Sequence, residues 1–553
     1  MIKSIVKVVF CALGLFVYGS TYAQIAERER PKEWDHLVEG ARFIDRFLPM
    51  QGKDLSADSW GAQCVLPRYV DNGIEDRIWS YWGGNITKGE DGLYHLFVCG
   101  WLEASPKGHM EWSNSYVFNA VSDNLTGPFR LRNMIGKGHN PEVYQLKDGR
   151  YVLYVIGGRY VSDNLNGKWE YGKFDFDARD RPIIEGLSNL SFAQREDGSY
   201  IMVCRGGGIW VSQDGLSTYH QLTDKRVYPD VDGRFEDPVI WKDHIQYHMI
   251  VNDWLGRIAY YLRSKDGVNW VVDPGEAYAP GIALHEDGRK EDWFKYERIK
   301  MFQDEYGRAV QANFAVIDTL KFEDKPFDTH SSKNIAIPLD PGLLLTIVDD
   351  KPINTKTKYI RVRIQAEEGF DPQADIDLSS LRFGASEEVN YGRGYKVLKT
   401  EEQGKDLIVT FDAEGKGIAK HEFAPKLIGK RKNGKMLYGY ARLPHAEYVA
   451  PLLSARKPAF SSNGKSMDCE LEIQNFGQVA SVITSLKIEA VVDGKRQLLC
   501  NGAIPPLQPY EKTDLKLSCK KKIETIEDCE IITTIYSGKE ILSTFRLKKG
   551  EKK

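Results

Sequence analysis

The stretch Ser122–Phe129, SDNLTGPF, decides the fold, because its outline recurs three more times along the chain. Each copy starts with a serine and turn-forming polar residues, follows a short apolar stretch and precedes an aromatic residue. The other copies start at Ser162, Ser212 and Ser264. An apolar stretch, a polar turn and an aromatic residue in this order predict a strand, a turn and a second strand.

A second turn signal alternates with the first. Asp-Gly pairs precede stretches in which tyrosine alternates with apolar residues, such as Leu93–Phe97, LYHLF. Asp-Gly between such stretches is typical of a β-hairpin. The pairs start at Asp91, Asp148 and Asp197, and Asp243-His244 and Tyr306-Gly307 occupy the same place twice more.

Together the two signals divide residues from about 60 to 330 into five hairpin-centred units of roughly 50–60 residues. Units of this size with several short strands are typical of propeller blades. We therefore predict an all-β chain that starts with a five-bladed β-propeller. An irregular β-sandwich is the alternative, but it does not require two turn signals in phase. The stretch Cys64–Arg68 is expected to close the ring of blades.

The predicted domain order has four parts. Residues 1–23 form a signal peptide, 24–335 the propeller, 336–450 a β-sandwich and 451–553 a second β-sandwich. Alternating strands such as Tyr359–Ile364 and Cys469–Ile473 predict the one or two sandwiches. The stretch that starts with Leu471–Gly477, LEIQNFG, resembles bacterial immunoglobulin-like adhesion modules.

The N-terminal segment has the features of a secretory signal. Lys3 and Lys7 precede the apolar run Val8–Tyr18, and the small residues Thr21 and Ala23 occupy the −3 and −1 positions of a cleavage site. No later apolar run reaches the ~18 residues of a membrane span. We expect an exported protein without a membrane span, located in the periplasm or secreted.

Composition narrows the function further. The 553 residues include 75 Lys and Arg against 78 Asp and Glu, a net charge of −3, which argues against nucleic acid as a partner. Aromatic residues make up 11% of the chain and suit strands and apolar ligand faces. The cysteines form no CxxC pair, so the sequence does not support a zinc knuckle. The last four cysteines could form two disulfides: Cys469, Cys500, Cys519 and Cys529.

Polar residues recur just upstream of the first hairpin of each unit. The innermost strand of a propeller blade starts at the central funnel, so these side chains are expected to converge on one pocket. Aligned by their hairpin turns, they are Asn85, Asn140, Asn189, Asp237 and Glu297.

Two of these residues, Asp237 and Glu297, are carboxyls on neighbouring blades. Glycoside hydrolysis needs such a pair, because one carboxyl protonates the leaving oxygen and the other activates water. Alternatively, the two residues cap loops or bind a structural cation, so a divalent cation in the funnel stays open as a cofactor. No metal-ligand set is predicted. His139, beside the funnel, is a general acid, a metal ligand, a hydroxyl binder or a turn cap.

Substrate binding is assigned to Asn85, Asn140 and Asn189 and to three neighbouring residues. Trp82 stacks on a sugar face or fills the blade core. Arg298 binds a substrate carboxylate or sulfate, or pairs with Glu297. Glu236 precedes Asp237 at the same funnel. The expected ligand is an oligosaccharide or polysaccharide.

The motifs Ser122–Phe129, His139-Asn140-Pro141 and Glu236-Asp237-Pro238 resemble the five-bladed propeller glycoside hydrolases of families 43, 62 and 117. The resemblance covers about residues 60–330. Family 43 places Asp, Asp and Glu on its first three blades, where this chain has three asparagines. Family 117 uses carboxylates on later blades and a histidine acid.

Asp237, Glu297 and His285 fall at places comparable to those of the family 117 residues, although His285 is alternatively a surface histidine. Asp76 is the nearest counterpart of that family's early-blade base. Together with the signal-like N-terminal segment, the resemblance implies an exported, exo-acting glycoside hydrolase that degrades plant or algal polysaccharide fragments. The alternatives are a non-catalytic carbohydrate-binding propeller and a polysaccharide lyase or glycoside phosphorylase on the same scaffold.

Overall fold

The computed structural model describes residues 25–183, 185–414, 418, 422–462, 466–520, 523 and 526–547, so the predicted signal peptide lies outside the described residues. Strands dominate. The described helices are short, and none has the length and hydrophobicity needed to span a membrane. They are η1 (Lys32–His36), η2 (Phe43–Arg46), η3 (Gly108–Asn114), α1 (Pro372–Asp375), α2 (Ser386–Val389) and η4 (Ile526–Asp528).

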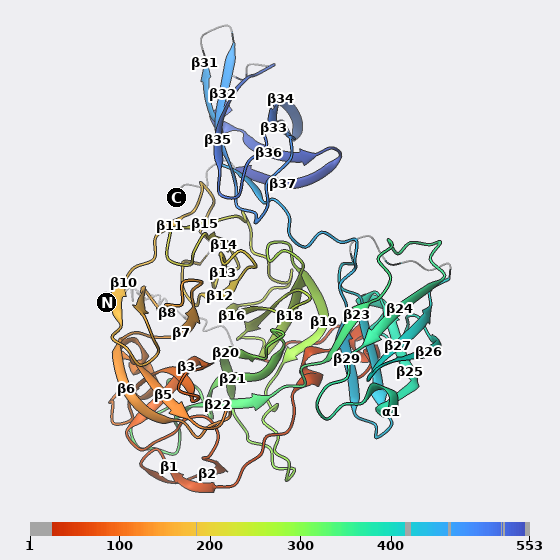
Figure 1. Cartoon of the computed structure of the whole chain (residues 1–553). Coiled ribbons are helices and arrows are strands. Elements are labelled where there is room, and N and C mark those ends of the chain that lie inside the picture. Colours follow the sequence, from red (N-terminus) through yellow and green to blue (C-terminus); the bar gives the residue numbers. More distant parts are fainter. Residues whose placement is uncertain are drawn as a thin grey trace, which may run out of the picture.

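Five sheets, antiparallel except for one short parallel pair in the third, follow one another between Trp79 and Pro338 and surround one axis as the blades of a propeller (Figure 1). This arrangement confirms the predicted five-bladed propeller. The strands of blades 1 and 2 are β3 (Trp79–Lys88), β4 (Tyr94–Leu102), β5 (Tyr116–Ser122) and β6 (Arg130–Lys137), then β7 (Glu142–Gln145), β8 (Tyr151–Val155), β9 (Gly158–Ser162) and β10 (Glu170–Gly172).

Blades 3 to 5 repeat the pattern, with a short extra strand on blade 3 and three strands in blade 5. They comprise β11 (Phe176–Asp177), β12 (Ser191–Gln194), β13 (Tyr200–Val203), β14 (Ile209–Ser212) and β15 (Tyr219–Gln221), then β16 (Phe235–Lys242), β17 (Tyr247–Asp253), β18 (Ile258–Ser264) and β19 (Val271–Tyr278), then β20 (Lys295–Gln303), β21 (Ala309–Ile317) and β22 (Ser332–Pro338).

The repeated serine motif forms the turn between the third and fourth strands of a blade. In blade 1 the buried Ser122 hydroxyl accepts a hydrogen bond from the Asn124 amide at 3.1 Å. In blade 4 the Ser264 hydroxyl accepts one from the Gly267 amide at 2.8 Å. The serine recurs because its hydroxyl satisfies a turn amide that the strands leave unpaired.

Aromatic side chains fill the spaces between blades. Phe192 of blade 3 packs on Tyr144 and Tyr154 of blade 2, with ring centroids 4.7 and 5.8 Å apart. Trp210 is also fully buried. Much of the aromatic content of the chain therefore forms the propeller core.

The ring closes where the segment before β3 joins blade 5. The Ile74 amide donates to the Asn334 carbonyl at 3.2 Å. This isolated bridge adds a fourth chain segment to the three strands of that blade. Gly73 permits the approach, because its φ is 68° and a Cβ there would lie 1.8 Å from the Asn334 carbonyl oxygen. The prediction that Cys64–Arg68 closes the ring is wrong.

Cys64–Arg68 instead belongs to β2 (Ala62–Tyr69), which pairs with β1 (Leu55–Ser59) in a separate two-stranded sheet. The Arg68 guanidinium is buried 3.3 Å from the centroid of the Trp60 ring and 3.3 Å from Glu75. This sheet therefore packs on the propeller without joining its ring.

Two sandwich-like domains follow the propeller, as predicted (Figure 1). In the first, one seven-stranded sheet curls onto itself, so that Phe383 and Phe411 from distant strands stack at 5.2 Å. Its strands are β23 (Leu343–Ile347), β24 (Tyr359–Ile364), β25 (Ile376–Gly384), β26 (Val397–Gln403), β27 (Asp406–Asp412), β28 (Lys426–Arg431) and β29 (Met436–Tyr440).

The second consists of two four-stranded sheets that enclose one core. None of the described cysteines is in a disulfide. The strands are β30 (Leu453–Ala455), β31 (Ala459–Ser462), β32 (Met467–Asn475) and β35 (Lys512–Ser518) in one sheet, and β33 (Thr484–Val492), β34 (Lys495–Ile504), β36 (Glu530–Ser537) and β37 (Glu540–Leu547) in the other.

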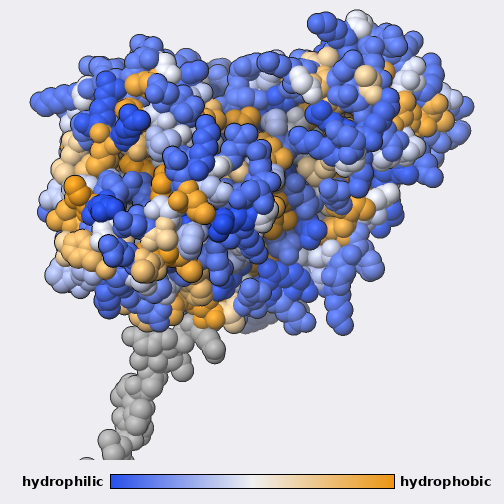
Figure 2. All heavy atoms as spheres, turned by 90° about the horizontal axis from the view of Figure 1, so that it is seen from below, coloured by the Kyte–Doolittle hydropathy of each residue, from blue (hydrophilic) through white to orange (hydrophobic). Residues whose placement is uncertain are grey.

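Buried charged contacts hold both sandwiches against the propeller. Arg308 of blade 5 makes a bidentate pair with Glu367 of the first sandwich at 2.7 and 3.1 Å. Arg179 of blade 3 is fully buried against Glu472 of the second at 2.9 Å. Seen from below, the molecule is mostly hydrophilic with scattered hydrophobic patches (Figure 2).

Candidate functional site

The inner strands of the propeller start with residues that form successive layers around the axis. One residue per blade has a left-handed backbone conformation, with φ between 52° and 62°, and in blades 1, 4 and 5 this residue belongs to a β-bulge. We call these residues the axis ring: Gly83, Asn140, Asn189, Asp237 and Arg298. The residues directly before them form the mouth ring: Trp82, His139, Ser188, Glu236 and Glu297.

This register differs from the one that turn alignment predicts. Asn140, Asn189 and Asp237 lie in one ring as expected, but blade 5 contributes Arg298 to it and blade 1 contributes Gly83. A Cβ on Gly83 would lie 3.5 Å from the Arg298 Cβ and 3.8 Å from the Asn140 amide oxygen. The absence of a side chain on blade 1 therefore leaves space for Arg298 at the axis.

Hydrogen bonds connect the axis ring across four blades. Asn140 Nδ2 donates to Asn189 Oδ1 at 3.5 Å, and Asn189 Nδ2 donates to Asp237 Oδ1 at 3.2 Å. Arg298 Nη1 lies 2.8 Å from Asp237 Oδ1, and the Arg298 amide donates to Asp237 Oδ2 at 3.1 Å. Asp237, not Glu297, is therefore the ion-pair partner of Arg298.

Asp237 has an unusual protonation equilibrium. Its carboxyl is 3% exposed, and burial raises its pKa to about 7 against the opposing charge of Arg298. The nearby carboxylates of Glu236 and Glu297 raise this pKa further. Asp237 can therefore hold a proton close to neutral pH.

Glu297 lies in the opposite environment. Its buried carboxylate is 3.2 Å from Lys295 Nζ and also contacts Lys321 Nζ. Burial alone would raise the pKa of Glu297, but Lys321 and Lys295 outweigh it and hold this pKa well below its usual range. Glu297 is therefore an ionised carboxylate one residue from the ion-pair partner of Asp237.

His139 and Glu236 continue the mouth ring. His139 Nδ1 is 2.9 Å from Ser115 Oγ, and its ring packs beside Trp112 at 5.0 Å. Burial and then the charges of Arg298 and Lys321 lower the pKa of His139 well below its usual range, so the imidazole is neutral. Glu236 Oε1 pairs with Arg205 Nη1 at 3.3 Å.

Below the axis ring, a second polar layer closes the axis. Lys300 of blade 5 reaches across to the buried Glu142 of blade 2 and forms an ion pair with it. Glu142 Oε1 also accepts hydrogen bonds from Ser191 Oγ at 3.1 Å and from the Phe192 amide at 3.2 Å, both on blade 3. The funnel is therefore blind at this end.

Asn85 belongs to this lower layer and not to the pocket. Its side chain donates to the Val143 carbonyl and accepts from the Val143 amide, both at 2.8 Å, and so joins blades 1 and 2. The structure thus contradicts the predicted position of Asn85. Asn140 and Asn189 lie eight residues before Asp148 and Asp197, and the same count from Asp91 reaches Gly83, whereas Asn85 lies only six residues before Asp91.

Three other predicted residues, Trp82, His285 and Asp76, are held by contacts within the protein. Trp82 is 1% exposed, with Lys321 Nζ 4.7 Å from its ring centroid. His285 lies outside the rings, buried 3.3 Å from Glu291 and beside the Tyr69 ring at 4.4 Å. Asp76 accepts hydrogen bonds from two backbone amides and from Tyr81, as a turn-capping residue does.

Two pockets lie beside the mouth ring, a large one at His139 and a small one at Glu297. The pocket at His139 is lined on blades 1 and 2 by Trp112, Ser115, Lys137, Tyr160 and Tyr171, among others. The pocket at Glu297 is lined on blades 4 and 5 by Asn252, Trp254, Arg257, Phe294 and Lys295, among others. The sequence argument missed Lys295 and Lys321, because neither has a repeated position that marks it.

Among the described residues, no group of three or more His, Cys, Asp or Glu side chains is arranged to hold a metal ion. At the axis, the carboxyls of Asp237 and Glu142 are paired with the cations of Arg298 and Lys300.

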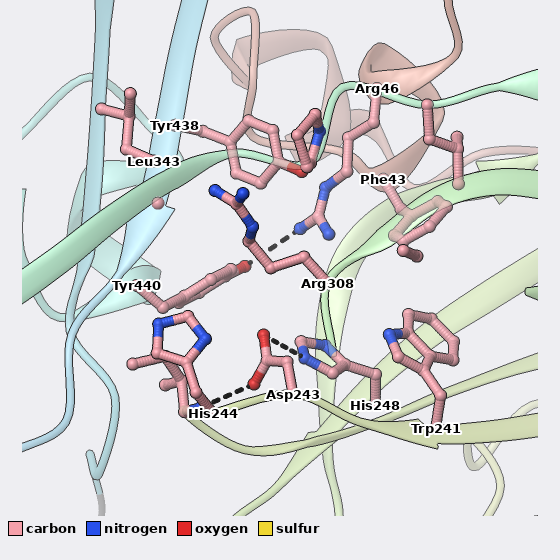
Figure 3. Close-up of a pocket in the computed structure, with 15 residues that line it drawn as sticks. Phe43, Arg46, Trp241, Asp243, His244, His248, Arg308, Leu343, Tyr438 and Tyr440 are labelled. Carbon is pink, nitrogen blue, oxygen red and sulfur yellow. Dashed lines mark hydrogen bonds and ion pairs between the residues drawn. The ribbon is translucent and has the colours of Figure 1, made fainter. Parts of the chain in front are cut away.

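A further cavity lies between blade 4, blade 5 and the first sandwich (Figure 3). Some of its polar groups contact each other: Asp243 Oδ2 is 3.0 Å from His248 Nε2, and Arg46 Nη2 donates to Tyr440 Oη at 3.4 Å. The Arg46 guanidinium also packs 4.5 Å from the centroid of the Phe43 ring. We assign these residues to domain docking.

No protein-family model and no curated protein matches the chain. Solved structures similar to it include a family 117 glycoside hydrolase of Zobellia galactanivorans (12% identity, 53% of this chain and 90% of that one, TM-score 0.37). An α-L-arabinofuranosidase of Lactobacillus brevis (12%, 47% and 91%, 0.33) and an endo-arabinase of Bacteroides thetaiotaomicron (13%, 47% and 94%, 0.30) are also similar. By its own sheet topology, the chain is a five-bladed β-propeller followed by two sandwich-like domains.

Proposed function

We propose that this protein is a glycoside hydrolase whose active site is the mouth of the propeller funnel. The observation that carries the proposal is the opposite environment of two neighbouring carboxyls. Burial raises the pKa of Asp237 to about 7, whereas Lys321 and Lys295 outweigh burial at Glu297 and lower its pKa. Carboxyls whose surroundings separate their pKa values in this way are suited to acid and base roles.

In this proposal Asp237 donates its proton to the glycosidic oxygen of the leaving group. The Glu297 carboxylate accepts a proton from the attacking water, or stabilises positive charge on the sugar ring. His139 and Glu236 line the same mouth as further contacts for sugar hydroxyls. His139 serves as a neutral donor or acceptor, because its pKa is lowered.

The closed axis supports exo action. The Glu142–Lys300 layer closes the axis below Asp237, so a glycan can approach Asp237 only from the mouth, and we propose that it does so with one end. We therefore propose that the enzyme removes terminal sugars from plant or algal polysaccharide fragments. The signal-like residues 1–23 support export to the periplasm or beyond.

One observation favours a non-catalytic carbohydrate-binding propeller as the second candidate. Both oxygens of Asp237 already have partners in Asn189 and Arg298. A substrate would have to displace one of these contacts before Asp237 could reach it. A binding protein would need no such displacement.

The test is an oligosaccharide panel with wild type, Asp237→Asn and Glu297→Gln, in which binding and sugar release are both measured. A hydrolase releases sugar as wild type and loses release in both variants. Binding without release supports the binding propeller, and full turnover in both variants overturns the site assignment. An ultraviolet-absorbing unsaturated product would identify a lyase, and dependence on added phosphate would identify a phosphorylase.

A further inference from the structure

In the immediate surroundings of Glu297, three cationic side chains face two carboxyls: Lys295, Lys321 and Arg298 against Glu297 and Asp237. Lys295 and Lys321 share the single carboxylate of Glu297, so at least one ammonium charge is not neutralised. Arg298 pairs with Asp237, whose raised pKa leaves it partly protonated near neutral pH. The centre of the site therefore carries an excess of positive charge.

Arg257 adds a further cation in the pocket beside Glu297. Its guanidinium packs 4.4 Å from the centroid of the Phe294 ring, and no carboxylate pairs with it in the described part of the chain. Charges on the other side of the mouth cancel: Glu236 pairs with Arg205, and Glu185 pairs with Arg226 at 3.3 Å.

Two buried imidazoles respond to this positive field. Burial lowers the pKa of His109 and of His139, and nearby cations lower both further: Lys321 and Lys295 for His109, Arg298 and Lys321 for His139. Glu297 opposes this effect at both rings. Both histidines therefore stay neutral and supply no additional cation.

The cations lie beside aromatic surfaces suited to sugar rings. Lys295 Nζ is 5.1 Å from the centroid of the Trp254 ring, and both residues line the pocket beside Glu297. Trp254 is only half-buried, so its ring is accessible from that pocket. An apolar sugar face on Trp254 would bring an acidic substituent close to Lys295 and Arg257.

We propose that the funnel mouth recognises a glycan with an anionic substituent, either a uronate carboxylate or a sulfate ester, through Lys321, Lys295 and Arg257, which lie beside the mouth ring. This inference rests on the proposed function only in placing the sugar at the funnel mouth. It requires binding and not turnover, so the two proposals can fail separately.

The test measures binding of the purified full chain to matched pairs of glycans by calorimetry. Polygalacturonate and alginate fragments represent uronates and are compared with their carboxyl-reduced neutral forms, and carrageenan fragments represent sulfate esters and are compared with their desulfated forms. We expect at least one acidic glycan to bind about tenfold or more tightly than its neutral counterpart, and added salt to weaken this binding. The pair that shows the difference identifies carboxylate or sulfate as the recognised group.

Two substitutions locate the contact. Arg257→Met removes a cation without disturbing the Glu297 ion pairs, and Lys321→Met keeps an aliphatic stem against Trp82. Each is expected to weaken acidic-glycan binding about tenfold and to leave neutral-glycan binding unchanged. Lys516→Met is the matched control, because Lys516 also pairs with a glutamate, Glu470 at 2.9 Å, but lies in the distant second sandwich.

Equal binding of acidic and neutral partners, or no binding of any acidic glycan, overturns the proposal. Unchanged acidic-glycan binding in both variants, with melting temperatures like that of wild type, overturns it as well. Acidic-glycan binding without sugar release would retain this inference and contradict the hydrolase function.

Discussion

Asp237 Oδ1 lies 2.8 Å from Arg298 Nη1, and Asp237 Oδ2 accepts a hydrogen bond from the Arg298 amide at 3.1 Å. Both residues have a left-handed backbone conformation, on the inner strands of blades 4 and 5. The side chain and the main chain of Arg298 on blade 5 thus fix the carboxyl of Asp237 on blade 4. This contact therefore orients the proposed acid.

Replacement of that carboxyl tests its role. Asp237→Asn keeps the shape of the side chain and can retain the hydrogen bond from the Arg298 amide, so the chain should fold. We expect sugar release to fall at least about 100-fold, because positioned general acids contribute about that much. Asp148→Asn, on an exposed turn of blade 2, is the control that should keep full activity. Release within about twofold of wild type would disprove the acid role.

The raised pKa of Asp237 predicts two pH effects. Activity should fall as pH rises through about 7, because the acid loses its proton. The folded chain keeps this proton up to about pH 7, whereas an unfolded Asp releases it near pH ~4. The folded state therefore binds more protons in this window, and this group makes the free energy of unfolding decrease as pH rises.

Melting curves between pH 5 and 8 check the stability effect. Asp237→Asn has no proton to release, so its melting temperature should rise relative to wild type as pH increases. A constant difference across the range would contradict the raised pKa.

Asn85 should contribute to stability and not to sugar binding. Asn85→Ala leaves the buried Val143 amide and carbonyl without the two 2.8 Å bonds that they now make. We expect a loss of about 2 kcal/mol in the free energy of unfolding, with glycan affinity unchanged. Denaturant unfolding measures the stability, and calorimetric titration measures glycan affinity. Weaker glycan binding without a loss of stability would show that Asn85 contributes to the pocket.

The Lys300–Glu142 pair makes a prediction about the closed axis. Lys300→Met leaves a buried carboxylate without its cation and should destabilise the propeller by about 3 kcal/mol. Adding Glu142→Gln should recover a large part of that loss, since the unpaired charge is removed. If the double variant is as unstable as the single one, the contact is one of packing and not of charge.

Arg179 should hold the second sandwich on the propeller. Its guanidinium donates to the Ser454 carbonyl and pairs with Glu472, both at 2.9 Å. Arg179→Met should weaken docking by about 2 kcal/mol, because hydrogen bonds to a charged group are lost. Faster protease cleavage of the segment between the two sandwiches would show that the second sandwich has separated from the propeller. Arg150→Met, at an exposed turn, should not change the cleavage rate.

Local turn chemistry made the propeller predictable. An Asp-Gly hairpin and a serine that caps a turn amide are decided by residues close in sequence, so their recurrence gave the number of blades. The same recurrence placed Asn140, Asn189 and Asp237 in one ring. It failed at Asn85, which lies six residues before its turn at Asp91, whereas Asn140 and Asn189 lie eight residues before theirs. The eighth residue before Asp91 is Gly83, which has no polar side chain to mark the position.

By itself, the sequence determined the all-β propeller, the two domains after it and the polar starts of its inner strands. Only the tertiary structure decided that Arg298 reaches the axis, that Glu297 is held by Lys295 and Lys321, and that Asp237 is buried enough to keep a proton. The physical reason is that charge and burial depend on groups far apart in the chain. Lys321 lies on a loop of blade 5, and no local pattern records which carboxylate it will meet.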